Sequence, residues 1–420
     1  MSHKKLLQPK VRFREFTGEN SVAWEQRKLG DYCEMFNGDR SSKYPNAQDM
    51  VSDGIPFINA GDLENGHVNL KTAKKISRGK YDELSGAKLQ LGDIVYCLRG
   101  TLGKNAYIDN FDKGTVASSL VAIRPKNIDG RYLYYILNSD IEYKQRIVHD
   151  EGAAQPNLSA KSVSEFVMPV PDIDEQKKIS AYFSNLDHLI ALHQRELDNL
   201  KITKQVFMKK MFPKEGEKVP EVRFPGFMAD WDYRKLGDVG ETYTGLSGKS
   251  KDDFGHGRGK YVTYMNVFSN SIANPSLVEL VEIDTKQNEV NPGDIFFTTS
   301  SETPEEVGMS SVWLENSDNT YLNSFCFGYR PIEKFDNYYL AYMLRSSVVR
   351  KKITFLAQGI SRYNISKNKV MDIAVPIPVI EEQTKIGEFF KQLDDIINLQ
   401  QQELEKLKQT KQAFLQKMFI

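Results

Sequence analysis

The chain contains one long segment twice. Residues 171–212 read PDIDEQKKISAYFSNLDHLIALHQRELDNLKITKQVFMKKMF, and residues 378–419 read PVIEEQTKIGEFFKQLDDIINLQQQELEKLKQTKQAFLQKMF. The two segments align without a gap at an offset of 207 residues, and 23 of the 42 positions are identical. Unrelated segments do not agree to this extent, so the protein is an internal duplication. Any fold must therefore accommodate two copies of one architecture.

Each copy has apolar residues at alternating steps of four and three, a 3.5-residue period that predicts a coiled-coil helix. The predicted core positions are Ile179, Phe183, Leu186, Ile190, Leu197, Leu200, Phe207 and Met211 in the first copy, and Ile386, Phe390, Leu393, Ile397, Leu404, Leu407, Phe414 and Met418 in the second. Two layers are polar in both copies, His193 with Gln400 and Lys204 with Lys411. Polar core positions lower stability but can set register and orientation. Because Gln400 replaces His193, we interpret His193 as a tolerated helix residue rather than a ligand.

The order of the segments predicts how the two helices pair. The first helix follows one globular region and leads into another, and the second helix follows that second region. Helices that pair within the chain are then antiparallel, and about 39 residues at 1.5 Å each give a length of roughly 58 Å. We predict an α+β protein with two mixed α/β domains, residues 1–173 and 213–380. An antiparallel coiled coil of residues 174–212 and 381–420 would separate them, with a pseudo-two-fold axis.

The composition is that of an ordinary water-soluble protein and excludes several classes. The formal net charge is zero, so binding to nucleic acid must depend on local patches or on partners that supply positive charge. Cys33, Cys97 and Cys326 are odd in number and far apart, which predicts neither disulfides nor a metal site and fits a reducing cytoplasm. No apolar run reaches the ~18 residues that a membrane span needs. The first ten residues lack the apolar core of a signal peptide.

The two globular regions share a set of sequence anchors, and their sequences differ in the stretches between these anchors. The shared anchors are WEQRKLGD at 24–31 with WDYRKLGD at 231–238, Gly-Asp-Ile at 92–94 with 293–295, VASSLVAIRP at 116–125 with LNSFCFGYRP at 322–331, the helix YLYYILNS at 132–139 with YLAYMLRS at 339–346, and Gly152, Asn157, Ser159 and Val163 with Gly359, Asn364, Ser366 and Val370. In contrast, residues 60–90 and 98–115 do not align with residues 240–290 or 298–321. A common scaffold with different loops suggests two related readers of different targets.

No motif in the chain forms a complete catalytic, cofactor or metal site. Gly248-Lys249-Ser250 ends like a phosphate-binding loop, but Tyr243 occupies the position of the required first glycine. The stretch 274–277, Asn-Pro-Ser-Leu, lacks the rest of an amino-methyltransferase motif. The letters Pro-Asp and Glu-Gln-Lys between 171 and 177 are too close for a nuclease site, and we interpret them as a helix start, where acids are favourable. The six histidines form no cluster.

Candidate DNA-contacting residues are basic or polar residues in the segments that differ. They are Lys71, Lys74, Lys75 and Arg78 in a stretch without acids, Arg99, Thr101, Lys104 and Asn105 in a loop after a predicted strand, and Lys249, Lys251, Arg258, Lys260, Thr299 and Ser300 in the second region. Arginine and lysine neutralise phosphates, whereas arginine, asparagine, serine and threonine can also read base edges. A run of charges is more often simply a solvated face.

The arrangement resembles the specificity subunit of type I restriction-modification systems. The resemblance covers essentially the whole chain and is carried by the paired MPVPDIDEQKKI and VPIPVIEEQTKI segments, the WEQRKLGD and WDYRKLGD openings, and the Gly-Asp-Ile strands. It implies two target recognition domains, each reading one half of a split, asymmetric DNA sequence, with helices that set the spacer. It also implies a non-catalytic subunit. Its partners would be two modification subunits, which use S-adenosylmethionine to methylate adenines, and two restriction subunits, which use ATP and magnesium.

Two other classes remain open from the sequence. One is a stand-alone bipartite DNA-binding regulator, for which the chain has no usual helix-turn-helix signal. The other is a coiled-coil scaffold whose globular regions bind protein or sugar. Co-purification with a methyltransferase-sized partner would distinguish the first class, and salt-dependent binding to duplex DNA would distinguish the second.

Overall fold

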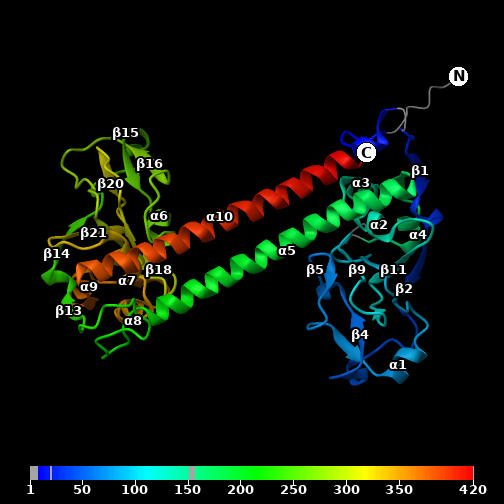
Figure 1. Cartoon of the computed structure of the whole chain (residues 1–420), viewed down its shortest axis with the longest axis horizontal. Helices are drawn as coiled ribbons and strands as arrows, with labels where there is room; N and C mark the ends of the chain where they lie inside the picture. Colours follow the sequence, from blue (N-terminus) through cyan, green and yellow to red (C-terminus); the bar gives the residue numbers. More distant parts are fainter. Residues whose placement is uncertain (1–7, 19–20, 151–156, 420) are drawn as a thin grey trace. The chain divides into compact units, whose positions relative to one another are not determined.

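The computed structural model describes residues 8–18, 21–150 and 157–419. The chain divides into two compact units: unit 1 comprises residues 1–193 and 403–420, and unit 2 comprises residues 194–402. Each unit holds its own strands and short helices together with one stretch of each of two long helices, α5 (Ile173–Lys210) and α10 (Ile380–Met418). Both long helices are drawn as unbroken coils in Figure 1.

The regular elements of unit 1 that precede α5 are mostly short strands. They are β1 (Glu25–Lys28), β2 (Cys33–Asn37), β3 (Met50–Val51), β4 (Ile55–Ile58), β5 (Leu63–Glu64), β6 (His67–Val68), β7 (Lys74–Ile76), α1 (Arg78–Glu83), β8 (Ile94–Cys97), β9 (Asn105–Tyr107), β10 (Thr115–Val116), β11 (Leu120–Pro125), α2 (Gly130–Ile136), α3 (Asp140–Val148), α4 (Ala160–Ser164) and β12 (Val167–Val170).

Unit 2 has a similar series of elements, which lie in the sequence between α5 and α10. Its elements are β13 (Asp232–Lys235), β14 (Gly240–Thr244), β15 (Phe254–Val262), α6 (Tyr264–Ser269), β16 (Val278–Val281), β17 (Ile295–Thr298), β18 (Ser300–Ser301), β19 (Ser310–Val312), β20 (Thr320–Leu322), β21 (Cys326–Pro331), α7 (Asn337–Met343), α8 (Ser347–Phe355), β22 (Tyr363–Asn364), α9 (Lys367–Met371) and β23 (Ala374–Ile377).

A four-stranded antiparallel sheet lies at the centre of each unit. Its strand order is β2-β11-β8-β9 in unit 1 and β14-β21-β17-β19 in unit 2. Ile123 pairs with Ile94 in the first sheet, and Tyr329 pairs with Ile295 in the second. Every residue of β8 and β17 is buried, which explains why both strands read as continuous apolar runs. Each Gly-Asp-Ile anchor thus leads directly into a buried strand.

A second sheet in each unit includes strands from the segments that do not align, β7 in unit 1 and β15 and β16 in unit 2. Its order is β10-β4-β7-β3 in unit 1 and β16-β15-β20 in unit 2. Phe57 of β4 pairs with Thr115 in parallel, and Tyr261 of β15 pairs with Tyr321 in parallel. An antiparallel neighbour, β7 or β16, completes each arrangement. In each unit the divergent segments thus contribute strands to the second sheet, although their sequences differ.

Short helices are more numerous than the sequence predicts. Between residues 31 and 170 the sequence predicts one clear helix, and α2 confirms it, but α1, α3 and α4 are also present. On α3 only Glu142 is buried, whereas Tyr143, Ile147 and Val148 are 54%, 58% and 78% exposed. A helix without a buried apolar stripe gives no periodic signal in the sequence.

The long helices bury the predicted heptad positions. Ten of the predicted core residues, which lie along the middle of the helices, are all buried or half-buried: Phe183, Leu186, Ile190, Leu197, Leu200, Phe390, Leu393, Ile397, Leu404 and Leu407. Several apolar residues outside the predicted core positions are exposed, with Leu189 at 40% and Leu399 at 58%. The 3.5-residue period therefore identified the buried face of each helix correctly.

Within unit 1 the two long helices are antiparallel. Phe183 stacks on Phe419 with ring centroids 5.9 Å apart, and Asp187, one turn later on α5, pairs with Lys411, two turns earlier on α10. The hydroxyl of Tyr135 on α2 donates to the same carboxylate at 2.8 Å. A polar heptad layer is thus occupied by an ion pair that also contacts the globular part of the unit.

Unit 2 repeats this arrangement. Lys204 of α5 pairs with Asp394 of α10, and the Tyr342 hydroxyl on α7 donates to Asp394 at 2.8 Å. Phe207, three residues after Lys204, lies against Phe389, five residues before Asp394, with ring centroids 5.1 Å apart. The helices of unit 2 are therefore also antiparallel, and both lysine layers have a carboxylate on the opposite helix.

A buried carboxylate links the start of each long helix to the preceding N-terminal segment. Nε and Nη2 of Arg12 donate to Glu175 at 2.6 and 2.7 Å, and the Trp24 indole N–H donates to it at 3.0 Å. Gln176 is also buried and donates to the Pro171 carbonyl at 2.8 Å. The same three contacts in unit 2 join Arg223, Trp231 and Glu382. The interpretation of this motif as a helix start is confirmed.

Candidate nucleic-acid interface

The acidic residues of the Gly-Asp-Ile turns are structural ion-pair partners. Asp93 is 1% exposed and accepts two hydrogen bonds of 2.8 Å from Arg124. Asp294 is equally buried and accepts bonds of 2.8 and 2.7 Å from Arg330. These hydrogen bonds raise the pKa of both arginines. The same aspartate–arginine ion pair therefore occurs in both units, and it explains why both units have the Gly-Asp-Ile and the Arg-Pro anchors.

The basic stretch of unit 1 runs from the turn before β7, through β7, to the start of α1. Lys71 and Lys74 are exposed, and no ion pair is found for either within the part of the chain that the structure describes. The remaining basic residues have acidic neighbours: Lys75 with Asp53 at 3.6 Å, Arg78 with Asp82 at 3.0 Å, and Lys80 with Asp49 at 3.3 Å. Lys71 and Lys74 thus carry the uncompensated positive charge of this stretch.

The loop after β8 divides into exposed and structural residues. Arg99 and Thr101 are exposed, and the Arg99 Nε donates to Asn157 Oδ1 at 3.0 Å. The Lys104 ammonium donates to the Ala60 carbonyl at 3.0 Å. Asn105 is only 5% exposed, and its amide is bonded to main-chain carbonyls inside the unit. Of the four candidates in this loop, Arg99 and Thr101 are open to a ligand.

In unit 2 the exposed cations lie on β15. Arg258 and Lys260 are exposed and lie two residues apart on this strand. Lys251 is exposed as well, in the short turn before β15. Lys249 differs, because its side chain is 11% exposed and pairs with Asp284 at 3.0 Å. Hydrogen bonds from the Lys286 amide and then from Lys249 lower the pKa of Asp284 to about 2.

The residues after β17 are held by hydrogen bonds. Thr299 Oγ1 donates to the Phe325 carbonyl at 2.9 Å, and Ser300 is 5% exposed. Ser300 Oγ accepts a hydrogen bond of 3.2 Å from Arg362, an exposed residue that the sequence reasoning did not select. The sequence could have indicated this residue, because Arg362 lies between the duplicated anchors Gly359 and Asn364.

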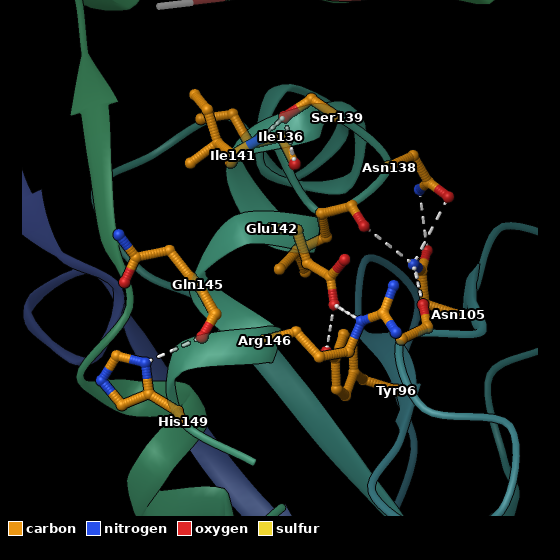
Figure 2. Close-up of polar contacts among 12 residues, drawn as sticks. Tyr96, Asn105, Ile136, Asn138, Ser139, Ile141, Glu142, Gln145, Arg146 and His149 are labelled. Atoms are coloured by element: carbon orange, nitrogen blue, oxygen red, sulfur yellow. Dashed lines mark hydrogen bonds and ion pairs between the residues drawn. The ribbon is translucent and has the colours of Figure 1, made fainter. Parts of the chain in front are cut away.

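A buried polar cluster in unit 1 was also missed. Figure 2 shows the Glu142 carboxylate between the Tyr96 hydroxyl and the Arg146 guanidinium, whose Nε donates to it at 2.9 Å. Asn105 and Asn138 bond to each other beside it at 2.8 Å. Burial raises the pKa of Glu142, against the opposing effects of Tyr96 and Arg146.

The equivalent place in unit 2 is apolar. By the duplicated anchors, Tyr96, Glu142 and Arg146 correspond to Phe297, Val349 and Ile353, each 0% exposed. One unit thus fills this part of its core with a charge pair and the other with hydrocarbon. The cluster is consequently an internal packing solution specific to unit 1, and it lies among core residues rather than with the exposed candidates.

Metal-binding clusters and membrane-spanning helices were sought throughout residues 8–18, 21–150 and 157–419. In these ranges no group of three or more potential metal-ligating side chains occurs. No helix in the same ranges is both long and apolar enough to cross a bilayer. The three cysteines are buried and unpaired. Burial raises the pKa of Cys33 and Cys326 to about 12, so neither is an activated thiolate.

Comparisons with known proteins give a consistent result. The family described as "Type I restriction modification DNA specificity domain" matches residues 21–201 and again residues 228–409. The putative type I restriction enzyme MjaX specificity subunit of Methanocaldococcus jannaschii is 22% identical over 95% of this chain and 93% of its own length. The HindI specificity subunit of Haemophilus influenzae is 27% identical over 45% of this chain and 40% of its own.

Solved structures show the same fold. The type I restriction-modification S subunit from M. genitalium superposes with a TM-score of 0.60 at 14% identity, covering 99% of both chains. A second structure, reported for complex assembly and conformational transition of the type I R-M system, gives a TM-score of 0.56 at 18% identity, with 93% and 96% coverage. The two family matches coincide with the two halves of the duplication. The chain therefore belongs to the type I restriction-modification DNA specificity family, with two specificity domains.

Proposed function

We propose that this chain is the specificity subunit of a type I restriction-modification complex, in which each unit reads one half of a bipartite, asymmetric DNA site. One observation carries the proposal: in each unit the divergent segments contribute strands to a second sheet, and they bear exposed cations for which no ion pair is found among residues 8–18, 21–150 and 157–419. These are Lys71 and Lys74 in unit 1, and Arg258 and Lys260 in unit 2. Cations position a protein on phosphates, and divergent neighbours can then read different bases.

The long helices would set the distance between the two half-sites and dock the modification subunits. In this proposal residues 1–173 and 213–380 are the recognition domains, and residues 174–212 and 381–420 are the spacer helices. Supporting it, α5 and α10 run for 38 and 39 residues without interruption. Their lysine layers have carboxylate partners in equivalent places in both units, which favours a single pairing register.

Catalysis would belong to partner subunits. Two modification subunits would bind S-adenosylmethionine and methylate adenines, and two restriction subunits would use ATP and magnesium to translocate and cut DNA. This chain would contribute recognition and assembly but no chemical step. The formal net charge of zero fits such a division, because a complex that surrounds DNA can supply positive charge from several chains.

Adenine methylation in cells tests the proposal. Cells carrying the intact system should methylate a split sequence with a fixed spacer, and deletion of this chain should abolish that pattern. Replacing residues 240–321 with the equivalent span of a relative should change one half of the methylated sequence and leave the other unchanged. If both halves changed, independent reading by the two units would be wrong. Regulation of transcription without methylation would favour a stand-alone DNA-binding regulator instead.

A further inference from the structure

Two short segments pair in the same way at one edge of each unit. The Leu158 amide donates to the Leu98 carbonyl in unit 1, and the Ile365 amide donates to the Thr299 carbonyl in unit 2, at 2.9 and 3.0 Å. Leu98 and Thr299 each lie five residues after the buried aspartate of the Gly-Asp-Ile turn. Their positions are therefore equivalent, and the segments can be compared residue by residue. We call each pair of segments the paired edge of its unit.

In unit 1 a guanidinium on the first segment occupies the paired edge. Arg99 directly follows Leu98, lies opposite Asn157, and donates from Nε to Asn157 Oδ1 at 3.0 Å. In unit 2 the residue directly after Thr299 is Ser300, which lies opposite Asn364. The arginine of the first segment is thus replaced by a small hydroxyl residue in the second unit.

In unit 2 the guanidinium comes from the second segment. Residues 358–364 form a hairpin closed by two 2.9 Å hydrogen bonds between the main chains of Gln358 and Asn364. Gly359 has a φ of 147°, and a side chain there would collide with the Arg362 carbonyl, so the turn requires glycine. This turn places Arg362, whose Nη2 donates to Ser300 Oγ at 3.2 Å. In the sequence of unit 1, Gln155 stands at the position of Arg362 and lies outside the described residues.

Both arginines have neutral hydrogen-bond partners. Most guanidinium groups in the described ranges are taken up by carboxylates or buried carbonyls, as Arg124 is by Asp93 and Arg345 is by main-chain oxygens. Arg99 and Arg362 are exposed and bonded to an amide or hydroxyl oxygen. A neutral partner orients the group but leaves its charge available to an anion. Such a hydrogen bond is readily exchanged for a charge-assisted one, which is roughly twice as strong.

We propose that Arg99 and Arg362 are equivalent anchors that bind a DNA phosphate, one in each half-site. The units differ in the residues around the paired edge, yet each has one exposed guanidinium there, supplied from opposite segments, with no carboxylate partner among residues 8–18, 21–150 and 157–419. A feature common to two units that read different sequences is expected to bind the part of DNA that all sequences share, which is the phosphate backbone. Phosphate contacts set register without carrying sequence information. The inference rests on the proposed function, since it requires both units to bind duplex DNA.

Salt-dependent binding tests the inference. The assay uses the full chain in complex with its modification subunits and a labelled duplex bearing the methylated target. Arg99→Ala and Arg362→Ala should each reduce the magnitude of the negative slope of log K against log salt by about 0.9 and weaken binding about eightfold near 0.1 M salt, with an additive effect in the double variant. Arg99→Lys and Arg362→Lys should retain the slope, because the charge remains.

Matched controls and readouts separate the possible failures. Arg27→Ala and Arg234→Ala remove exposed arginines at equivalent positions that already pair with Glu25 and Glu333, and they should leave the slope unchanged. Thermal unfolding checks that each variant is folded. An unchanged slope in folded alanine variants would overturn the inference, as would an altered methylated sequence with no change in slope, which indicates base reading. If the wild-type complex itself showed no salt-dependent DNA binding, the proposed function would fail instead.

Discussion

Replacing Glu175 by glutamine should destabilise unit 1 selectively. The carboxylate is 1% exposed and neutralises Arg12, whose side chain is 6% exposed. Glutamine keeps an acceptor for the Trp24 N–H but removes the charge, so the buried guanidinium loses its counter-ion. Removing one partner of a buried pair destabilises a protein by about 3–5 kcal/mol. For a unit of about 200 residues this corresponds to a fall in Tm of roughly 6–20 °C.

The duplication supplies the internal comparison. Glu382→Gln makes the same change against Arg223 in unit 2 and should lower the stability of that unit by a similar amount. Glu165→Gln is the control in unit 1, because the Lys28–Glu165 pair is exposed and its loss should leave the transition unchanged. Differential scanning calorimetry, with hydrogen exchange to assign each transition to a unit, measures the result. If Glu175→Gln melts with the wild-type protein, the buried pair does not hold the helix start and the reasoning is refuted.

Three further predictions concern the core and the helices. Glu142→Gln should gain stability relative to wild type as pH rises from 4 to 7. Burial raises the pKa of Glu142, which faces Tyr96 and Arg146, so the folded state favours the protonated form. The resulting stabilisation of the wild-type protein is full below the unfolded pKa and is lost as pH rises through the folded pKa. A stability difference in urea unfolding that did not change with pH would contradict this. Lys204→Met should lower the stability of unit 2 by about 1 kcal/mol, because it leaves the half-buried Asp394 without its cation, and Asp394→Asn in the same chain should recover part of that loss by thermal melting. One heptad inserted after Leu200, with a matching insertion in the second helix, adds about 10 Å, so the methylated spacer should lengthen by about three base pairs; an active variant that kept the original spacer would show that the helices do not set it.

Part of the candidate interface was predictable and part was not. Charge and position in a divergent segment identified Lys71, Lys74, Arg99, Arg258 and Lys260, all of which are exposed. The same criteria also selected residues that the fold uses internally. Composition does not reveal whether a lysine has a carboxylate beside it, because that carboxylate can come from a distant strand. Arg362 was missed for the converse reason, since its role depends on a hairpin that brings it to Ser300.

The sequence by itself determined the duplication, the two long helices and their buried faces. Those features are local and periodic, so a repeat of 3.5 residues and an offset of 207 express them directly. Only the tertiary structure decided what the duplicated polar anchors are for. The bonds of Glu175 to Arg12, and of Asp93 to Arg124, join residues 163 and 31 positions apart. It also decided that strands from the divergent segments join a second sheet in each unit, because strand pairing depends on main-chain hydrogen bonds that many side-chain sequences permit.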